Sequence, residues 1–263
     1  MESKIQMIIT DLDKSLLNNE RQITEFTKII FHECIKNGII IVFATARPLR
    51  VTKIFYNSIL PHAIICHNGA VAYVNEKQMY QCGIKPIMAK TLLKNIIGNF
   101  PKANLAIETN DQIYTNFDAS SIWVDIVSKN LDVSNLPMTD IDKIIVQIES
   151  IEKINEIKMY LPEELYLEIN EGRLGLIMNK GATKWNAVRE LLKYYKIESK
   201  NAIAFGDDYN DLEMIINCGI GVAMYNGIDE IKNKAKYICG KNDEDGIAKW
   251  IDKNIIKYGQ NCI

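Results

Sequence analysis

Two aspartates that follow a short apolar run are the first residues in this sequence with evident chemical potential. Ile5 to Thr10 is apolar and rich in β-branched residues, as in a buried strand, and it leads directly to Asp11, with Asp13 two residues later. The Asp11 carboxylate in this place could attack phosphorus and form an aspartyl-phosphate. Asp13 could donate a proton to the leaving oxygen and then accept one from water. Turn formation and helix capping are the alternative explanation for each aspartate taken alone.

Three further apolar runs also end in polar side chains. The polar groups after them are Thr45-Ala46-Arg47, His67-Asn68, and Gly206-Asp207-Asp208-Tyr209-Asn210-Asp211. Ligands of open parallel sheets bind beyond the carboxyl ends of the strands, so we expect these residues to share one crevice with Asp11. Turn chemistry does not explain why two acidic clusters close two separate buried strands.

Several carboxylates in one crevice repel one another, and a hard divalent cation removes that repulsion. We therefore predict a Mg²⁺ site that uses the carboxylates of Asp11 and Asp207 and a backbone carbonyl near Asp13. The hydroxyl of Thr45 could donate a hydrogen bond to a transferring phosphoryl group. Lys184, in the first turn of a predicted helix, could supply a fixed positive charge.

The order of the predicted elements is that of an α/β fold with a parallel sheet covered by helices. Strands alternate with helices up to residue 66, and the same alternation returns after residue 183. Between them the pattern changes to two hairpins, at Thr109-Asn110-Asp111 and at Asn170-Glu171-Gly172-Arg173, with helices expected over 87–97, 121–130 and 151–160. We predict a Rossmann-like core of residues 1–81 and 180–263 with an inserted α+β domain of residues 82–179.

Composition excludes several classes of protein. The 263 residues carry a formal net charge of -2 without a basic cluster, which argues against nucleic acid and membrane surfaces as partners. We expect neither a signal peptide nor a membrane helix. The six cysteines form no CxxC pair, so we expect a cytoplasmic protein with core cysteines at 34, 66 and 218. Phosphate-binding P-loop, dinucleotide and zincin motifs are absent, and we expect a monomer or weak homodimer.

Four motifs in order resemble those of the haloacid dehalogenase superfamily, in its Cof-type (subclass IIB) sugar-phosphatase branch. They are Asp11-Leu12-Asp13-Lys14-Ser15-Leu16-Leu17, Thr45-Ala46-Arg47-Pro48, Gly181-Ala182-Thr183-Lys184 and Gly206-Asp207-Asp208-Tyr209-Asn210-Asp211. The turn Asn68-Gly69-Ala70 and the later Glu244-Asp245-Gly246 also match. The resemblance covers nearly the whole chain, and its ordered set of motifs is specific.

The resemblance implies a role for each matched residue. The catalytic residues would be Asp11 as nucleophile, Asp13 as acid and base, Thr45 and Lys184; Arg47, Asn68, Lys184 and Asn210 would bind substrate; Asp11, Asp13, Asp207 and Asp211 would hold Mg²⁺. The inserted domain would act as a cap that closes over the crevice and selects the leaving group. The substrate would be a small phosphorylated metabolite such as a sugar phosphate, a nucleotide, flavin mononucleotide or pyridoxal phosphate.

Two departures from the family pattern bear on activity. Lys14 and Ala46 stand where the family usually has glycine, and Lys14 would crowd its loop if the backbone there needs a positive φ. Two alternatives to a phosphatase stay open at this point. One is a sugar phosphomutase of the same branch, and the other is a regulatory protein that binds phosphorylated metabolites but has impaired catalysis.

Overall fold

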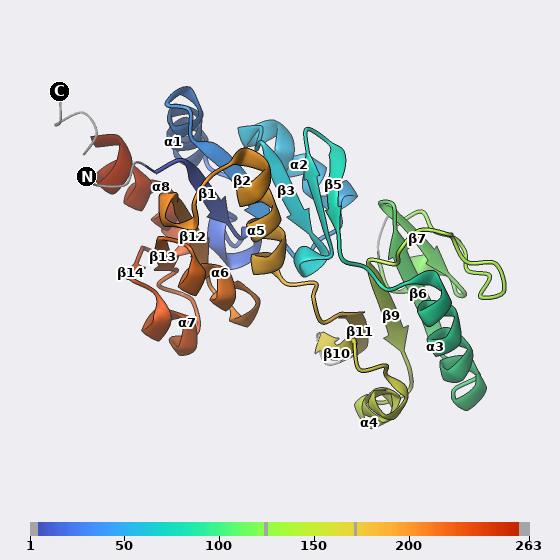
Figure 1. Cartoon of the computed structure of the whole chain (residues 1–263). Helices are drawn as coiled ribbons and strands as arrows, with labels where there is room; N and C mark the ends of the chain where they lie inside the picture. The colour runs from blue at the N-terminus through green and yellow to red at the C-terminus, as the bar shows by residue number, and fades with distance from the viewer. Residues whose placement is uncertain (1–4, 124–125, 171–172, 258–263) are drawn as a thin grey trace. The chain divides into compact units, whose positions relative to one another are not determined.

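Residues 5–123, 126–170 and 173–257 are described by the structure, a computed structural model (Figure 1). The chain divides into two units, one formed by Met1–Tyr80 with Thr183–Ile263 and the other by Gln81–Ala182. Each unit has its own sheet and its own apolar core.

The first unit is built on an eight-stranded sheet in the order β14-β13-β12-β1-β2-β3-β4-β5. Its strands are β1 Met7–Thr10, β2 Ile40–Ala44, β3 Ala63–Cys66, β4 Val71–Val74, β5 Lys77–Gln81, β12 Ala202–Gly206, β13 Ile220–Ala223 and β14 Tyr237–Ile238. The six strands from β14 to β3 run parallel, and β4 turns back antiparallel to β3. The two motif-bearing strands β1 and β12 are neighbours, with Met7 opposite Ala202 and Thr10 opposite Phe205.

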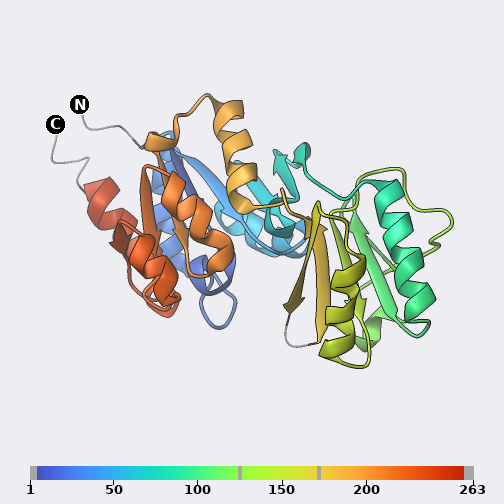
Figure 2. The same cartoon turned by 60° about the horizontal axis from the view of Figure 1, so that its bottom comes forward.

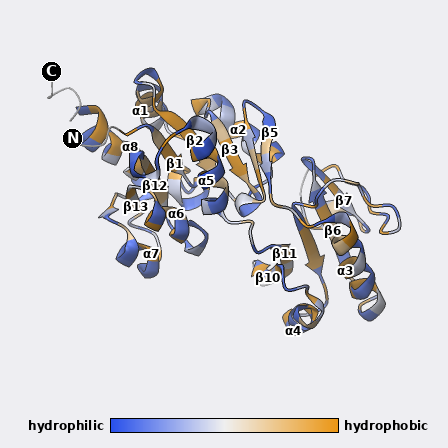
Figure 3. Ribbon diagram, viewed as in Figure 1, coloured by the Kyte–Doolittle hydropathy of each residue, from blue (hydrophilic) through white to orange (hydrophobic). Residues whose placement is uncertain are grey.

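Helices cover both faces of this sheet, which confirms the predicted α/β fold. One face packs against α1 Glu25–Lys36, α2 Leu49–Ile59 and α8 Gly246–Ile251, the last continued by a wider helical turn over Asp252–Ile256. The other packs against α5 Lys184–Tyr195, α6 Leu212–Asn217 and α7 Asp229–Lys234. The layers are visible in Figure 2, and Figure 3 shows β2 and β3 coloured as hydrophobic. Their side chains alternate between two buried cores, so they are apolar on both faces.

The second unit is an α+β layer. Its six-stranded sheet has the order β10-β11-β9-β6-β7-β8. The strands are β6 Asn104–Thr109, β7 Gln112–Thr115, β8 Lys129–Asn130, β9 Lys143–Gln147, β10 Leu165–Asn170 and β11 Leu174–Asn179, and the helices are α3 Pro86–Asn99 and α4 Ile151–Glu156. The helices cover one face of the sheet through an apolar core that includes Leu92, Ile96 and Ile154. Both predicted hairpins are present, as β6–β7 and β10–β11.

The predicted helix over residues 121–130 is wrong. A short helical turn ends at Ser121, and Lys129–Asn130 form β8, which pairs with β7; residues 124 and 125 lie outside the described part of the chain. Trp123 and Ile126 pack against the sheet face that the helices leave uncovered. These apolar residues are therefore spaced to cover a sheet rather than to form one side of a helix.

A hairpin that the sequence did not predict follows Gly69. Strands β4 and β5 are joined by Asn75 and Glu76, both with positive φ (47° and 62°), as the tight turns of hairpins require. Glutamate is an uncommon residue in that position, which hid the turn signal.

The three cysteines predicted to be core residues, Cys34, Cys66 and Cys218, are buried, as expected. Within the described ranges, no helix has both the length and the apolar character that crossing a membrane would require.

Gly69 sets the position of the helix that carries Lys184. Its φ is +103°, and a Cβ atom there would lie 2.1 Å from the carbonyl oxygen of Thr183, the N-cap of α5. The turn after β3 therefore packs directly on the start of α5. Only glycine allows both the backbone conformation and this approach.

Gly69→Ala should destabilise the first unit by several kcal/mol, since it adds a backbone clash to the cost of a positive φ. Gly38→Ala is the matched control, because Gly38 has φ +76° but nothing within 4 Å of its added Cβ. The control should lose only about 1–2 kcal/mol, the cost of the left-handed conformation. Urea unfolding of both variants tests this. Equal losses would show that the contact with Thr183 is unimportant.

Candidate functional site

The loop after β1 presents Asp11 and Asp13 at the carboxyl edge of the sheet. The amide of Asp11 donates to the carbonyl of Phe205 at 3.1 Å, so the Asp11 backbone is still held by the neighbouring strand β12. A wide helical turn over Leu12–Leu16 follows and is closed by the amide of Leu16 donating to the carbonyl of Asp11 at 3.2 Å. Asp11 is buried, with only 6% of the residue exposed.

The backbone at Lys14 has φ 58° and ψ 9°, which is the left-handed conformation that the family's usual glycine favours. For a residue with a Cβ this costs about 1–2 kcal/mol. The residue is exposed, and its carbonyl accepts a hydrogen bond from the Asn226 side chain at 2.8 Å. The loop therefore keeps a strained turn between Asp13 and Ser15.

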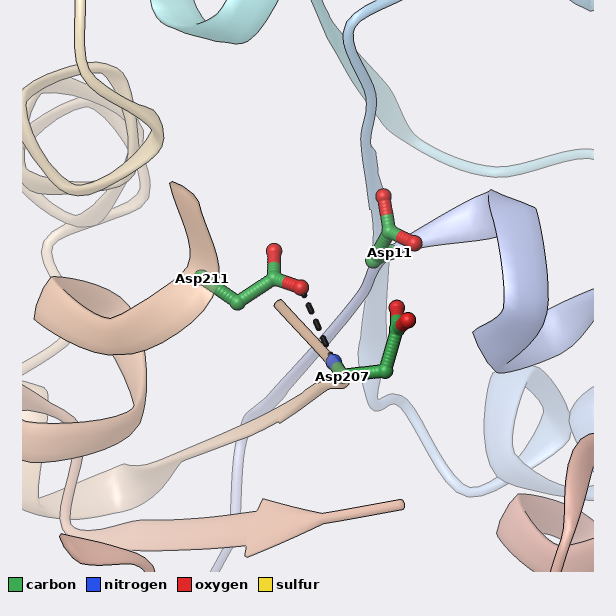
Figure 4. Close-up of side chains that lie close together, drawn as sticks. All are labelled: Asp11, Asp207 and Asp211. Atoms are coloured by element: carbon green, nitrogen blue, oxygen red, sulfur yellow. Dashed lines mark hydrogen bonds between the residues drawn. The ribbon is translucent and has the colours of Figure 1, made fainter. Parts of the chain in front are cut away.

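Three carboxylates come together at the ends of β1 and β12. One oxygen from each of Asp11, Asp207 and Asp211 lies within 4.8 Å of the others, and all three residues are buried (Figure 4). The amides of Asp207 and Asp208 donate to Asp211 Oδ2 at 3.0 and 3.3 Å, which fixes that carboxylate. An added Cβ at Gly206 would lie 2.4 Å from the Asp211 Cβ, so glycine is required there.

Lys184 lies between two of these carboxylates. Its Nζ donates to Asp11 Oδ1 at 2.7 Å and to Asp211 Oδ1 at 2.6 Å, and the residue is only 1% exposed. Helix α5 begins at Lys184 because the Thr183 hydroxyl accepts from the Asn186 amide as N-cap. Burial lowers the pKa of Lys184, but the charges of Asp11 and Asp211 outweigh burial and hold that pKa above its ordinary value.

Asp13 does not join the three-carboxylate cluster through its side chain. Arg47 grips it with two hydrogen bonds, from Nε to Oδ2 at 2.7 Å and from Nη2 to Oδ1 at 2.5 Å. The Arg47 guanidinium also lies 5.3 Å from the centre of the Phe55 ring. Thr45 is fully buried, and its hydroxyl accepts from the Arg47 amide at 3.2 Å.

Asn68 and Asn210 are brought together at the rim. The Asn210 side chain donates to Asn68 Oδ1 at 3.0 Å, and Asn68 itself has a positive φ of 55°. All nine residues predicted for the site therefore lie in the first unit. Their roles in catalysis and binding stay predictions.

Three supporting residues were not identified as site residues from the sequence. The Ser15 hydroxyl donates to Asp207 Oδ1 at 3.1 Å, and the side chains of Asn226 and Asn242 donate to carbonyls of the loop that follows Asp11. Ser15 lies in the first motif, so its position was a usable signal. Asn226 and Asn242 lie more than 200 residues from their partners, and no local pattern indicates them.

The electrostatics of the cluster favour a bound cation. Burial, followed by the charges of the neighbouring carboxylates, raises the pKa of Asp207 to about 6. Burial also raises the pKa of Asp11 well above its usual range. The charge of Lys184 opposes this increase, and the charges of Asp211 and Asp207 add to it. Three buried carboxylates with one lysine leave excess negative charge, and an all-oxygen donor set suits a hard divalent ion. Asp11, Asp207 and Asp211 could therefore hold such an ion.

Lys184→Met should destabilise the protein by about 3–5 kcal/mol at pH 7.5, because it leaves two buried carboxylates without their cation. Without Lys184, protonation of the two buried carboxylates that it contacted is more favourable in the folded state than in the unfolded chain. The deficit should therefore shrink as the pH falls from 7.5 to 5.

Urea unfolding at both pH values measures this. Lys193→Met is the control, since Lys193 forms an exposed pair with Glu190 on the same helix and should cost less than about 1 kcal/mol. A deficit for Lys184→Met that is as small as the control's, or that does not change with pH, would contradict the account.

Comparison with known proteins identifies the family to which this chain is similar. The family model for haloacid dehalogenase-like hydrolases matches residues 8–251. A 5-amino-6-(5-phospho-D-ribitylamino)uracil phosphatase of Bacillus subtilis (strain 168), YitU, is 28% identical, covering 95% of this chain and 98% of the relative. Among solved structures, a haloacid dehalogenase-like hydrolase from Bacteroides thetaiotaomicron has a TM-score of 0.84 at 23% identity, covering 95% of this chain and 99% of that one.

A subclass IIB sugar phosphatase has a TM-score of 0.78 at 22% identity, covering 94% of this chain and 98% of that one. Both structural likenesses establish the fold. The family model spans nearly the whole chain, so it establishes family membership as well as the fold. This chain belongs to the haloacid dehalogenase-like hydrolase family.

Proposed function

We propose that this chain is a Mg²⁺-dependent phosphatase that hydrolyses phosphate monoesters of small metabolites through an aspartyl-phosphate on Asp11. The observation that carries the proposal is the buried cluster of Asp11, Asp207 and Asp211 around the Lys184 amine. A structural ion pair needs no third carboxylate, and excess buried negative charge is costly unless a cation binds. Family membership and the names of the relatives support a phosphatase.

The proposed reaction has two steps. In the first, a carboxylate oxygen of Asp11 bonds to phosphorus, the bond from phosphorus to the ester oxygen breaks, and Asp13 gives its proton to the departing alcohol. In the second, water attacks the aspartyl-phosphate and Asp13 takes a proton from that water. Inorganic phosphate leaves and both aspartates return to their starting states.

Lys184 and the cation have separate tasks in this scheme. Lys184 holds one oxygen of Asp11 at 2.7 Å, which fixes the direction of the other oxygen. Mg²⁺, bound by Asp11, Asp207 and Asp211, would neutralise charge on the phosphoryl oxygens. The phosphate would be contacted by the Thr45 hydroxyl and by the side chains of Asn68 and Asn210.

Arg47 occupies the carboxylate that the proposal assigns as the acid. Each oxygen of Asp13 accepts one hydrogen bond from the guanidinium and keeps a lone pair that can carry the proton. An incoming phosphate offers Arg47 a second anion of matching bidentate geometry. This supports the proposal that Arg47 binds substrate.

The proposed substrates are sugar phosphates, nucleotides, flavin mononucleotide and pyridoxal phosphate, together with the phosphorylated ribitylaminouracil in the name of the Bacillus subtilis relative. A phosphate-release screen over these compounds would identify the class. Release of an isomeric sugar phosphate in place of free phosphate would indicate a phosphomutase, and binding without any release would indicate a regulatory protein.

Asp11→Asn should reduce hydrolysis of p-nitrophenyl phosphate at least about 1,000-fold with the fold intact, because an amide cannot form the acyl-phosphate. Asp229→Asn is the control, since Asp229 is an exposed carboxylate paired with Lys232 on α7. Circular dichroism and the melting temperature check the fold. Activity of Asp11→Asn comparable to that of the control would exclude Asp11 as nucleophile.

Mg²⁺ should raise the melting temperature strongly at pH 7.5 and little at pH 5. The pKa of Asp207 is raised to about 6, so at pH 5 the folded protein without metal holds a proton there that Mg²⁺ must displace, whereas at pH 7.5 that proton is mostly gone. In the absence of Mg²⁺ the same group stabilises the fold at low pH, and that stabilisation is lost as the pH rises through about 6.

Thermal denaturation with and without Mg²⁺ at the two pH values tests this prediction. Asp207→Asn should remove the Mg²⁺ effect at both. An effect that is equal at pH 5 and 7.5, or that persists in Asp207→Asn, would place the cation elsewhere.

A further inference from the structure

The loop that carries Asp11 and Asp13 is tied down by two asparagines from distant segments. Asn226 Nδ2 donates to the carbonyl of Lys14 at 2.8 Å, and Asn242 Nδ2 donates to the carbonyl of Leu17 at 3.0 Å. The two asparagines are themselves connected, because the Asn242 amide donates to Asn226 Oδ1 at 3.0 Å. The bond from Asn226 lies next to Asp13, whereas the bond from Asn242 lies three residues further along the loop.

The turn that carries Asn226 is anchored on Asp207. The Ile228 amide donates to the carbonyl of Asp207 at 2.9 Å, and the Met224 amide donates to the carbonyl of Gly206 at 3.0 Å. A Cβ atom at Gly227 would lie 2.9 Å from the Asp207 carbonyl oxygen, so the turn packs tightly there. Asn226 therefore connects the backbone of Asp207 with the loop of Asp11 and Asp13.

The residue that Asn226 holds is the one in the unfavourable conformation. Lys14 has φ 58°, which a residue with a Cβ adopts at a cost, so its turn needs external support. The Lys14 carbonyl belongs to the peptide between Lys14 and Ser15, at the end of this turn. A hydrogen bond to that carbonyl restrains ψ of Lys14, and with it the turn that directly follows Asp13.

We propose that Asn226 is a positioning residue that holds the left-handed turn at Lys14 and thereby sets Asp13 and Asp11 relative to Asp207. The proposal rests on the proposed function for its kinetic consequence. It differs from a purely structural role because the effect on turnover should depend on the conformation at residue 14.

Asn226→Asp is the sharpest test. The aspartate keeps the shape and the acceptor for the Asn242 amide but loses the donor to the Lys14 carbonyl. It should lower kcat about 10- to 100-fold and change KM less than about 3-fold, the pattern expected when catalytic groups are misplaced. Asn37→Ala is the control, since the Asn37 side chain donates to the Glu33 carbonyl at 2.8 Å on the surface of α1.

Rescue separates positioning from simple loss of stability. Lys14→Gly relaxes the positive φ, so a turn with glycine should hold without Asn226. The fall in kcat caused by Asn226→Asp should shrink to less than about 3-fold when measured against Lys14→Gly alone. A fall of the same size in both backgrounds, or a fall no larger than that of Asn37→Ala, would overturn the proposal.

Hydrogen exchange gives a second measurement that needs no turnover. Amides of residues 14–17 should exchange at least about 10-fold faster in Asn226→Asp than in the wild type, and Lys14→Gly should restore their protection. Unchanged exchange would overturn the proposal. A wild-type protein without phosphatase activity but with this exchange pattern would refute the proposed function and leave the positioning role of Asn226 supported.

Discussion

The arrangement of the site depends on one buried cation, the amine of Lys184, held between the carboxylates of Asp11 and Asp211. Removing an ammonium group from water costs several kcal/mol, which only well-placed partners offset. Much of the local backbone serves this geometry: Gly69 allows the start of α5 to approach, and Gly206 leaves room for Asp211. A third carboxylate, on Asp207, exceeds what the lysine neutralises, and that excess makes the site suitable for a divalent cation.

The site residues lie on the loops that follow the strands rather than on the strands themselves. The strands β1 and β12 end side by side, and the loops beyond them carry the carboxylates. Beyond that edge, a strained turn at Lys14 is held by Asn226, whose own turn rests on Asp207. Strained backbone that neighbouring groups over-determine is common at functional sites. Here the strained residue is Lys14, and the hydrogen bond from Asn226 to its carbonyl is the contact that we propose supports it.

Sequence patterns predicted the parts of the site that lie at strand ends, because apolar runs followed by Asp11 or Asp207 are local signals. The direct grip of Arg47 on Asp13 was not predictable, since two side chains expected at one crevice have many ways to pair. The contact of Asn226 with Lys14 was also not predictable, because the two residues lie 212 positions apart. The helix predicted over 121–130 failed because its apolar residues cover a sheet face, and periodicity over ten residues does not distinguish that from a helix.

The most direct test of the central claim is to trap the phosphoryl group on the enzyme. Acid quenching during turnover of a phosphorus-labelled substrate, followed by pepsin digestion at low pH and tandem mass spectrometry, should place the label in the peptide that contains Asp11 and Asp13. The account predicts the phosphoryl group on Asp11. Label on Asp13 or on another residue, or a full burst of product without labelled protein, would contradict it.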